Sequence, residues 1–227
     1  CGTPVASLRR TLAAHDLNGV TDAVVAAKSA IVEQAELPAS KILGVGIVMP
    51  GPFGRTGLSG TGSELSIFHD ISPTNWFTEA LSIPVVVEND ANAAAVAELV
   101  AGVASGFDTF ACQYFGNGLG LGHIQGGRLK RGANGNDAAA EPLSLAITIF
   151  EILFDPDAVI LGGAMPDAIF DHLISSVTLA ERSVSNRPGR TTDRLLRGAS
   201  GRMTGTLGAG ALVINRAFTP RIAAVAR

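Results

Sequence analysis

The sequence predicts an α/β protein in which apolar strands and amphipathic helices alternate and pack as layers. Continuous apolar runs at residues 42–49, 84–88 and 158–161 stop at proline, polar or glycine residues, which is typical of strands buried on both faces. Between these runs, apolar residues recur every three or four positions, as in surface helices. The content of 47% hydrophobic and 16% charged residues in 227 positions indicates a globular chain with a sizeable core.

The first half of the chain is expected to contain three strands and three helices. Residues 20–36 have a helical apolar period that starts at Thr21 or Asp22. The apolar run 42–49 ends at Pro50-Gly51-Pro52, so it is expected to be a central strand that enters a sharp loop. The other expected elements are a turn and strand in residues 1–8, a Gly/Ser/Thr-rich loop over 50–75, a helix over 76–81, a strand over 84–88 and a helix over 91–103.

The second half of the chain begins with three consecutive strands and then returns to alternating helices and strands. Residues 109–116 and 119–124 are expected to be strands, because both are rich in aromatic, β-branched or glycine residues. Gly126-Gly127 supplies a turn into a third strand at 128–131. Cys112 is expected to fill a buried strand position. The remaining expected elements are a helix over 138–153, a strand over 158–161, a helix over 169–179, a strand over 194–199 and a helix over 206–217.

Composition excludes several classes of protein. The formal net charge is −3. The chain therefore has no broad basic surface, and its charge implies neither a nucleic-acid nor an anionic-membrane partner. Cys1 and Cys112 stand far apart, which argues against a disulfide framework or a zinc site built from this chain alone. No apolar run reaches the roughly 20 residues of a membrane span, and cytoplasmic localisation is expected. The chain opens without a methionine, and a preceding segment is expected.

The junction at residues 84–95 is the most informative stretch. The strand Val85-Val86-Val87 ends in Glu88-Asn89-Asp90, and an alanine-rich helix begins at once. Ligands gather at the carboxyl ends of strands in open α/β sheets, and a carboxylate placed there can accept a proton while an amide orients a hydroxyl. The alternative is that Asn89 or Asp90 only caps the helix, since both residue types favour that position.

Two glycine-rich strand ends are candidate phosphate and nucleotide sites. Glycines at 116, 118 and 120 would let backbone N–H groups approach phosphate oxygens without a Cβ in the way. A plain β-hairpin turn is the alternative for this stretch. Gly162-Gly163 follows a buried strand and could seat a purine or ribose against bare backbone, with tight packing between a helix and a strand as the alternative.

In order along the chain, five motifs resemble the ROK family of sugar kinases and sugar-responsive repressors. They are Gly46-Ile47-Val48-Met49-Pro50-Gly51-Pro52, Val87-Glu88-Asn89-Asp90-Ala91-Asn92, Gly116-Asn117-Gly118-Leu119-Gly120, Gly132-Ala133-Asn134-Gly135, and Asp155-Pro156-Asp157 through Gly162-Gly163-Ala164. The resemblance implies an actin-like ATPase (ribonuclease H-like) fold, with duplicated mixed sheets flanked by helices and two lobes around a cleft. An N-terminal lobe at 1–90 and a C-terminal lobe at 91–227 are then expected.

The resemblance also implies roles for individual residues. Asp90 matches the catalytic base of the family's kinases, and Asn89 matches a ligand of a sugar hydroxyl. Gly62 and Asn75 fall where sugar contacts arise in the family, although for Asn75 a turn before Trp76 is the favoured interpretation. Glu88 is expected to brace the loop. Binding of the phosphates and nucleotide is implied for Gly116, Asn117, Gly118, Gly120, Gly162 and Gly163.

Three family motifs are absent from the sequence. They are the opening D-x-G-G-T loop, and the E-x-G-H and Cys-rich zinc motifs expected after Gly135. Only about twenty residues separate Gly135 from Asp155, which is short for the family. Either the protein is a degenerate relative, or a segment is missing near Asn136-Asp137. The second explanation is favoured, and an intact mass equal to 23.2 kDa would contradict it. A structural Zn²⁺ is expected only if the Cys-rich segment exists.

Two functions follow from the resemblance. The first is ATP-dependent phosphorylation of a hexose or N-acetylhexosamine hydroxyl, with Mg²⁺ as cofactor. The alternative is a sugar-responsive transcriptional regulator whose N-terminal helix-turn-helix lies outside these residues, and only this alternative implies DNA as a partner. Family members commonly form dimers, so a homodimer or a higher homo-oligomer is expected, with no membrane partner.

Overall fold

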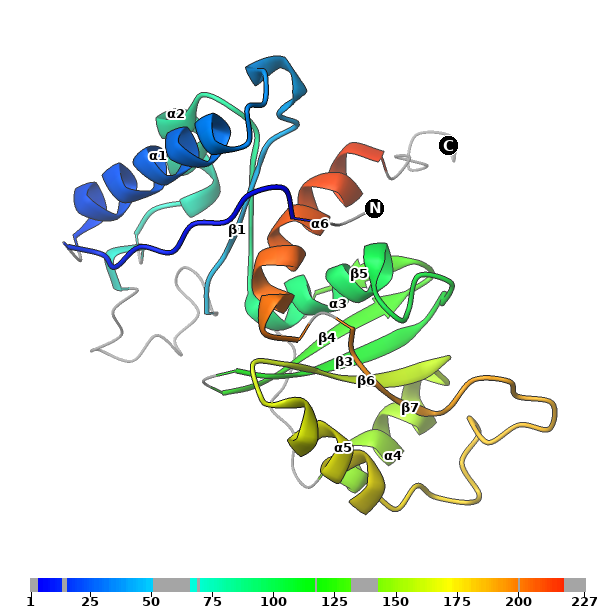
Figure 1. The fold of residues 1–227 in the computed structure, drawn as a ribbon. Coiled ribbons are helices and arrows are strands. Elements are labelled where there is room, and N and C mark those ends of the chain that lie inside the picture. The colour runs from blue at the N-terminus through cyan, green and yellow to red at the C-terminus, as the bar shows by residue number, and fades with distance from the viewer. Residues whose placement is uncertain are drawn as a thin grey trace.

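Two β-sheets with helices on their faces make up the computed structural model (Figure 1). The structure describes residues 4–13, 16–50, 66–68, 70–116, 118–131, 143–199 and 201–218. The α/β class predicted from the alternation of strands and helices is confirmed. Among the described residues no helix is both long and apolar enough to cross a membrane.

The first sheet consists of two parallel strands, β1 (Val45–Val48) and β2 (Val85–Glu88). Helices α1 (Leu17–Gln34) and α2 (Pro73–Leu81) lie on one side of it (Figure 1). Each helix starts at a side-chain cap: Asp16 accepts a hydrogen bond from the N–H of Gly19, and Ser72 accepts one from the N–H of Asn75. These caps explain why α2 begins three residues earlier, and α1 four or five residues earlier, than expected. Short 3₁₀ turns occupy Ala39–Lys41 and Ser66–Phe68.

The second sheet has five strands in the order β5-β4-β3-β6-β7. Strands β3 (Phe110–Phe115), β6 (Ala158–Gly163) and β7 (Leu195–Arg197) run parallel to one another, and β4 (Leu119–Gln125) and β5 (Arg128–Lys130) are antiparallel additions. The predicted strands in this half are therefore confirmed, with ends within a few residues of those expected.

Helices cover both faces of the second sheet (Figure 1). On one face, α3 (Asp90–Ala101) and α6 (Thr204–Phe218) pack over Phe110 and Cys112, and on the other, α4 (Leu143–Phe154) and α5 (Asp167–Ser176) pack over Ala111. Successive β3 residues thus alternate between two cores, as the pleat requires. A 3₁₀ turn at Gly201–Met203 leads into α6.

Helix α6 joins the two sheets. A Cβ at Gly208 would lie 2.5 Å from the carbonyl oxygen of Ala93 on α3, and one at Gly46 would lie within 2 Å of the carbonyl oxygen of Ala209. Glycine therefore allows α6 to touch both α3 and β1 at backbone distance. Because α6 contacts elements on both sides of residue 90, the division into lobes at that point stays a prediction.

Three other expectations concern residues 1–8 and 132–137. The strand expected in residues 1–8 is wrong over residues 4–8, which have no strand, and Val5 is largely exposed because no neighbouring strand pairs with it. The expected turn at 132–135 and the expected junction near Asn136-Asp137 lie outside the described residues.

Candidate active site

The sequence leaves open whether the polar residues after β2 form a reactive site or only cap helix α3, and the structure of the β2–α3 junction distinguishes the two. Asn89 is the helix cap: its Oδ1 accepts a hydrogen bond from the N–H of Asn92 at 2.8 Å, and its side chain is buried. Asp90 is the first helical residue, so its carboxylate is not needed as the cap. The junction can therefore provide both a helix cap and a reactive carboxylate.

Asp90 is only partly buried, and its charge is held at the start of α3. Its Oδ1 accepts a hydrogen bond from the N–H of Ala91 at 2.9 Å. Burial raises the pKa of Asp90 above its ordinary value, and the backbone N–H groups of Ala91 and of Asp90 itself lower it in part. A carboxylate with a raised pKa and a partly open face binds a proton more readily than an ordinary surface aspartate.

Glu88 fixes the junction from beneath. Its Oε1 accepts hydrogen bonds from the N–H of Asn89 at 3.1 Å and from Nδ2 of Asn92 at 3.0 Å. Its Oε2 accepts hydrogen bonds from Nε and one Nη of Arg131 at 2.8 and 2.6 Å. Because Glu88 is 5% exposed, it braces the loop that carries Asn89 and Asp90 and does not reach solvent.

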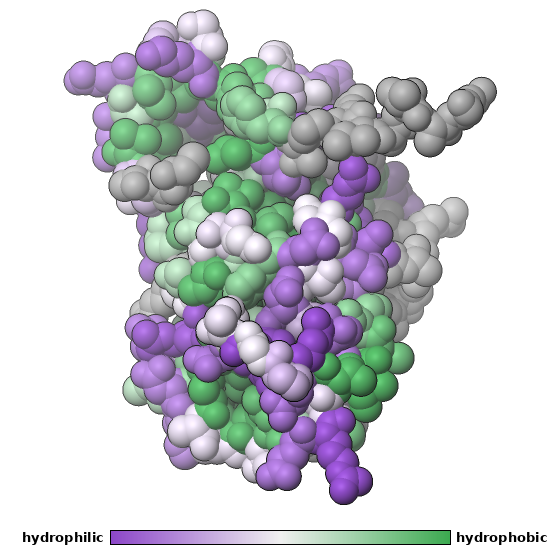
Figure 2. Space-filling model, turned by 90° about the vertical axis from the view of Figure 1, so that its right-hand side faces the viewer, coloured by the Kyte–Doolittle hydropathy of each residue, from purple (hydrophilic) through white to green (hydrophobic). Residues whose placement is uncertain are grey.

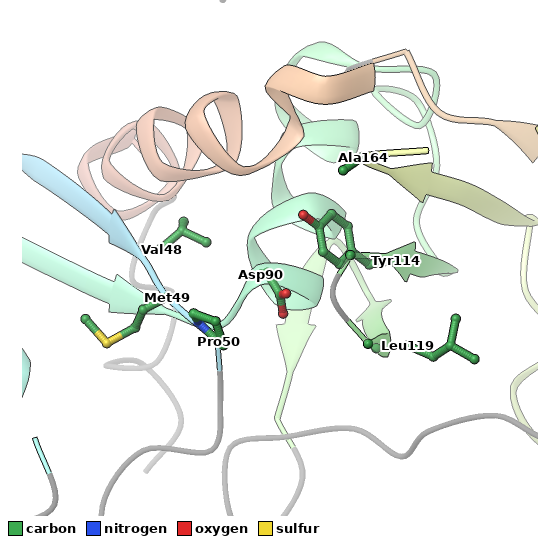
Figure 3. A pocket seen from close by; sticks show the side chains of 10 residues that line it. Val48, Met49, Pro50, Asp90, Tyr114, Leu119 and Ala164 are labelled. Atoms are coloured by element: carbon green, nitrogen blue, oxygen red, sulfur yellow. The ribbon is translucent and has the colours of Figure 1, made fainter. Parts of the chain in front are cut away.

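A pocket of about 400 Å³ opens in front of Asp90 (Figure 3). Its walls come from the end of β1, the first residue of α3, the β3–β4 connection with the strand ends beside it, and the residue after β6. Asp90 is the only carboxylate among the described residues that line it, and Tyr114 is the only aromatic residue there. The full lining is Val48, Met49, Pro50, Asp90, Tyr114, Gly116, Gly118, Leu119, Gly120 and Ala164.

The glycines of the β3–β4 connection have different surroundings. Gly116 and Gly118 are exposed at the pocket, and a Cβ at Gly118 would meet nothing within 4 Å. A Cβ at Gly116 would lie 2.6 Å from Cε1 of Tyr114 and 3.5 Å from Oδ2 of Asp90. The N–H of Gly116 donates to the carbonyl of Gly118 at 3.0 Å. The connection thus offers bare backbone near Asp90, with one N–H already bonded within the loop.

Gly120 has a packing role in addition to its place at the pocket. A Cβ there would lie 2.7 Å from Cβ of Ala91, and one at Gly122 would lie 2.3 Å from the carbonyl oxygen of Ala91. These two glycines let the first turn of α3 lie directly on β4. The position of Asp90 over the pocket therefore depends on them.

The glycine pair at the end of β6 is buried. Gly163 has φ +131°, and a Cβ there would lie 2.2 Å from the carbonyl oxygen of Phe115. Only glycine is compatible with that conformation and that approach. Gly162 and Gly163 lie outside the pocket lining, while the next residue, Ala164, belongs to it.

The remaining candidate residues are not brought to the pocket by the described structure. Asn75 lies exposed in the first turn of α2 and is not among the residues that line the pocket. Gly62 and Asn117 lie outside the described residues. Within the described ranges, no three His, Cys, Asp or Glu side chains cluster as metal ligands.

Tyr114 is a site residue that the sequence reasoning missed. It is the single tyrosine of the chain, and it projects into the pocket from the end of β3 toward Asp90 (Figure 3). Its place two residues before Gly116, on the face of β3 that also carries Cys112, was a signal that could have identified it.

Comparisons of the sequence and of the structure with known proteins all point to the same family. The model of the ROK family matches residues 10–141. The β-glucoside kinase of Listeria monocytogenes serovar 1/2a is 34% identical over 92 residues, which cover 40% of this chain and 31% of that kinase. The chain thus matches less than a third of the length of that curated relative.

Solved structures of ROK proteins share the fold. The ROK hexokinase of Thermus thermophilus superposes with a TM-score of 0.69 at 19% identity, over 97% of this chain and 94% of the hexokinase. The ROK glucokinase of Streptomyces griseus, in complex with glucose and AMPPNP, gives 0.60 at 20% identity over 88% of each chain. A ROK transcriptional regulator, a homologue of the E. coli MLC protein, gives 0.60 at 17% identity over 87% of this chain and 68% of the regulator.

At these identities the structural likeness shows the fold, and the predicted actin-like ATPase architecture is confirmed. The family model matches more than half of the chain. The chain therefore belongs to the ROK family.

Proposed function

We propose that this protein binds a hexose or an N-acetylhexosamine beside Asp90 and transfers the γ-phosphoryl group of ATP to one of its hydroxyls. The observation that carries the proposal is the pocket in which a partly buried carboxylate faces an exposed glycine connection. Sugar kinases among the relatives and structural neighbours, one of them solved with glucose and AMPPNP, support the reaction class.

In this mechanism Asp90 is the catalytic base. Its carboxylate accepts the proton of the reacting hydroxyl while that oxygen bonds to the γ-phosphorus and the bond to the bridging oxygen of ADP breaks. The raised pKa of Asp90 favours this proton transfer. Asn89 holds a neighbouring sugar hydroxyl or fixes Asp90 through the cap, and Gly62 and Asn75 remain proposed sugar contacts.

The nucleotide is assigned to the glycine side of the pocket. Gly116, Asn117, Gly118 and Gly120 would approach the phosphates, and the open space over Gly118 fits such an approach. Gly162 and Gly163 would lie beneath the nucleoside. Mg²⁺ supplies charge neutralisation for the phosphates when it is bound.

A sugar-sensing regulator is the second candidate, and one observation favours it. The N–H of Gly116 is bonded to the carbonyl of Gly118, and the ring of Tyr114 lies against Gly116. Phosphate binding at Gly116 requires that bond to open, whereas sugar sensing does not. Under this candidate DNA binding belongs to an N-terminal helix-turn-helix outside these residues. We place the protein in the cytoplasm as a homodimer or higher homo-oligomer in both cases.

The deciding experiment is a coupled assay of ADP release with a panel of hexoses and N-acetylhexosamines, run alongside calorimetric titration of the same sugars. The proposal predicts turnover with at least one sugar that also binds. Sugar binding without any turnover, together with sugar-dependent DNA binding by the full-length protein, would establish the regulator instead.

A further inference from the structure

A second pocket, of about 450 Å³, opens at the end of the second sheet opposite to Asp90. Its walls include residues that precede β3 and β6, whereas the Asp90 pocket is lined by the residues that directly follow those two strands. Each strand is six residues long, so the two pockets lie roughly 20 Å apart. A ligand in the second pocket therefore does not touch the proposed catalytic base.

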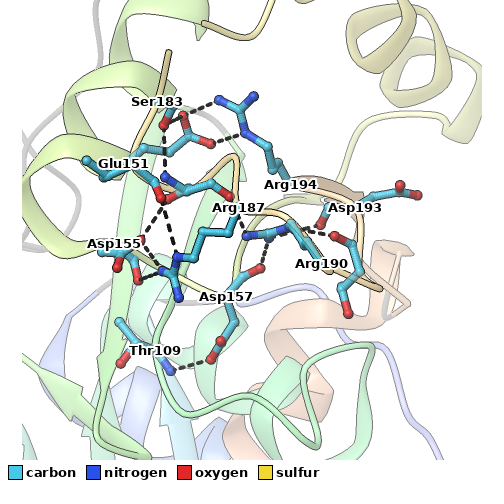
Figure 4. Close-up of polar contacts among 12 residues, drawn as sticks. Thr109, Glu151, Asp155, Asp157, Ser183, Arg187, Arg190, Asp193 and Arg194 are labelled. Atoms are coloured by element: carbon cyan, nitrogen blue, oxygen red, sulfur yellow. Dashed lines mark hydrogen bonds and ion pairs between the residues drawn. The ribbon is translucent and has the colours of Figure 1, made fainter. Parts of the chain in front are cut away.

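The remaining wall is the segment Arg187-Pro188-Gly189-Arg190-Thr191-Thr192, and the side chain of Arg190 fixes its shape. The guanidinium donates hydrogen bonds to four backbone carbonyl groups (Figure 4). They belong to Asp157, Ser185, Thr192 and Asp193. Gly189, at φ +82°, forms the turn before Arg190, in a conformation that glycine adopts without strain. The segment is therefore held in place before any ligand binds.

Positive charge is in excess in the lining of this pocket, which contains Arg187 and Arg190 against the single carboxylate of Asp157. Arg190 has no carboxylate partner among the described residues, because its acceptors are neutral carbonyl groups. The Asp157 carboxylate is turned to the backbone, where its Oδ2 accepts hydrogen bonds from the N–H groups of Asp108 and Thr109 at 2.9 and 3.0 Å. The pocket is therefore suited to an anion.

Hydrogen-bond donors remain available on the same segment. One Nη of Arg187 pairs with Asp155, and the other has no acceptor in the part of the chain that the structure describes. The hydroxyls of Thr191 and Thr192 likewise have no partner within the described ranges. Arg187 is 53% exposed, and Figure 2 shows hydrophilic atoms over the lower part of the face on which the loop between α5 and β7 lies. Guanidinium and hydroxyl donors together suit phosphate oxygens.

We propose that this pocket binds a small phosphate monoester, whose phosphate group is held by the two arginines and the two threonine hydroxyls of segment 187–192. A phosphate group alone would leave most of the 450 Å³ empty, because pockets of about 300 to 1,000 Å³ hold whole small molecules. The partly buried ring of Phe107 lines the pocket and offers an apolar wall for the organic part. The inference does not depend on the proposed catalysis.

Calorimetric titration of the whole protein with inorganic phosphate, glucose 6-phosphate and AMP tests the proposal. At least one of the two monoesters is expected to bind with a Kd of about 1 mM or lower, and more tightly than inorganic phosphate. Arg187→Gln is expected to weaken this binding about tenfold, because a hydrogen bond between charged groups is lost. The matched control is Arg197→Gln. Arg197 is a 41% exposed arginine that pairs with Asp171 outside the pocket, and its replacement is expected to leave binding unchanged.

A second variant keeps the proposal testable if Arg187→Gln does not fold. Thr191→Val replaces an exposed hydroxyl by a methyl group of similar shape, and it is expected to weaken binding several-fold with an unchanged circular dichroism spectrum. Tighter binding of glucose 6-phosphate would identify a sugar phosphate as the ligand, and tighter binding of AMP a nucleotide. Three results would overturn the proposal: no binding of either monoester at about 10 mM, inorganic phosphate binding as tightly as both monoesters, or equal affinity of Arg187→Gln and wild type, which would place the ligand in another pocket.

Discussion

Tyr114 and Asp90 line the same pocket and converge on Gly116, where a Cβ would lie 2.6 Å from Cε1 of Tyr114 and 3.5 Å from Oδ2 of Asp90. In the sheet, Tyr114 lies opposite Gly120 on β4 and Gly162 on β6. No neighbouring strand therefore places a side chain beside the tyrosine ring on its face of the sheet. Burial, and then the charge of Asp90, raise the pKa of Tyr114, so its hydroxyl keeps its proton at neutral pH and can donate a hydrogen bond.

Tyr114→Phe tests whether that hydroxyl helps to position the transferring phosphoryl group. Loss of one donor to a charged group is expected to lower kcat about tenfold, while KM for the sugar changes little. Steady-state kinetics with both substrates measure the effects on kcat and on KM separately. Should Tyr114→Ala turn over faster than the wild type, the ring would be an obstacle to the phosphates and the positioning role would be wrong.

Glu88 is expected to hold the β2–α3 junction. Glu88→Ala removes the acceptor for the N–H of Asn89 and for Asn92 and leaves Arg131 unpaired, so the free energy of unfolding should fall by about 2 to 4 kcal/mol. Urea unfolding measures this. Arg131→Ala leaves the buried carboxylate of Glu88 without its cation, so it is also expected to lower the free energy of unfolding, to a comparable extent. Equal stability of Glu88→Ala and wild type would exclude the bracing role.

Gly122→Ala tests the close packing of α3 on β4. Its Cβ would lie 2.3 Å from the carbonyl oxygen of Ala91, so α3 must shift, with an expected loss of about 1 to 3 kcal/mol in unfolding free energy and weaker sugar binding. Gly210→Ala is the matched control. That helical glycine has open space around it, and alanine there should stabilise α6 by about 0.5 to 1 kcal/mol. Thermal unfolding of both variants decides between these outcomes.

His123 is expected to make stability depend on pH. It packs edge-on against Phe150 at 5.0 Å between ring centroids, and burial, followed by the positive charge of Lys130, lowers its pKa below 6.5. The folded state prefers neutral His123, so this contribution to stability is present above pH ~6.5 and is lost as the pH falls through the lowered pKa. Unfolding at pH 5 and 7.5 should show a smaller pH effect in His123→Leu. An unchanged pH effect would contradict this account.

Much of the fold was predictable because local signals and tertiary packing agree. The run Val85 to Val87 followed by Asn89, a favoured cap, predicts both the strand and the start of α3. Tyr114 was missed because an aromatic residue in a strand is ordinary, and only its glycine neighbours across the sheet reveal that it faces a pocket. Likewise, the sequence could not distinguish a phosphate contact at Gly120 from contact with Ala91, since that depends on where α3 lies.

Asp90→Asn, measured for turnover and for sugar binding on the same preparation, tests whether Asp90 is the catalytic base. Asparagine can still accept the bond from Ala91 but cannot accept the proton, so kcat should fall at least about 100-fold while the calorimetric affinity for the sugar stays within a few-fold. Wild-type kcat/KM should also fall toward low pH with a midpoint above 3.8, the ordinary pKa of this carboxyl, because burial raises it. An Asp90→Asn protein that retains wild-type turnover would contradict the assignment of Asp90 as the base.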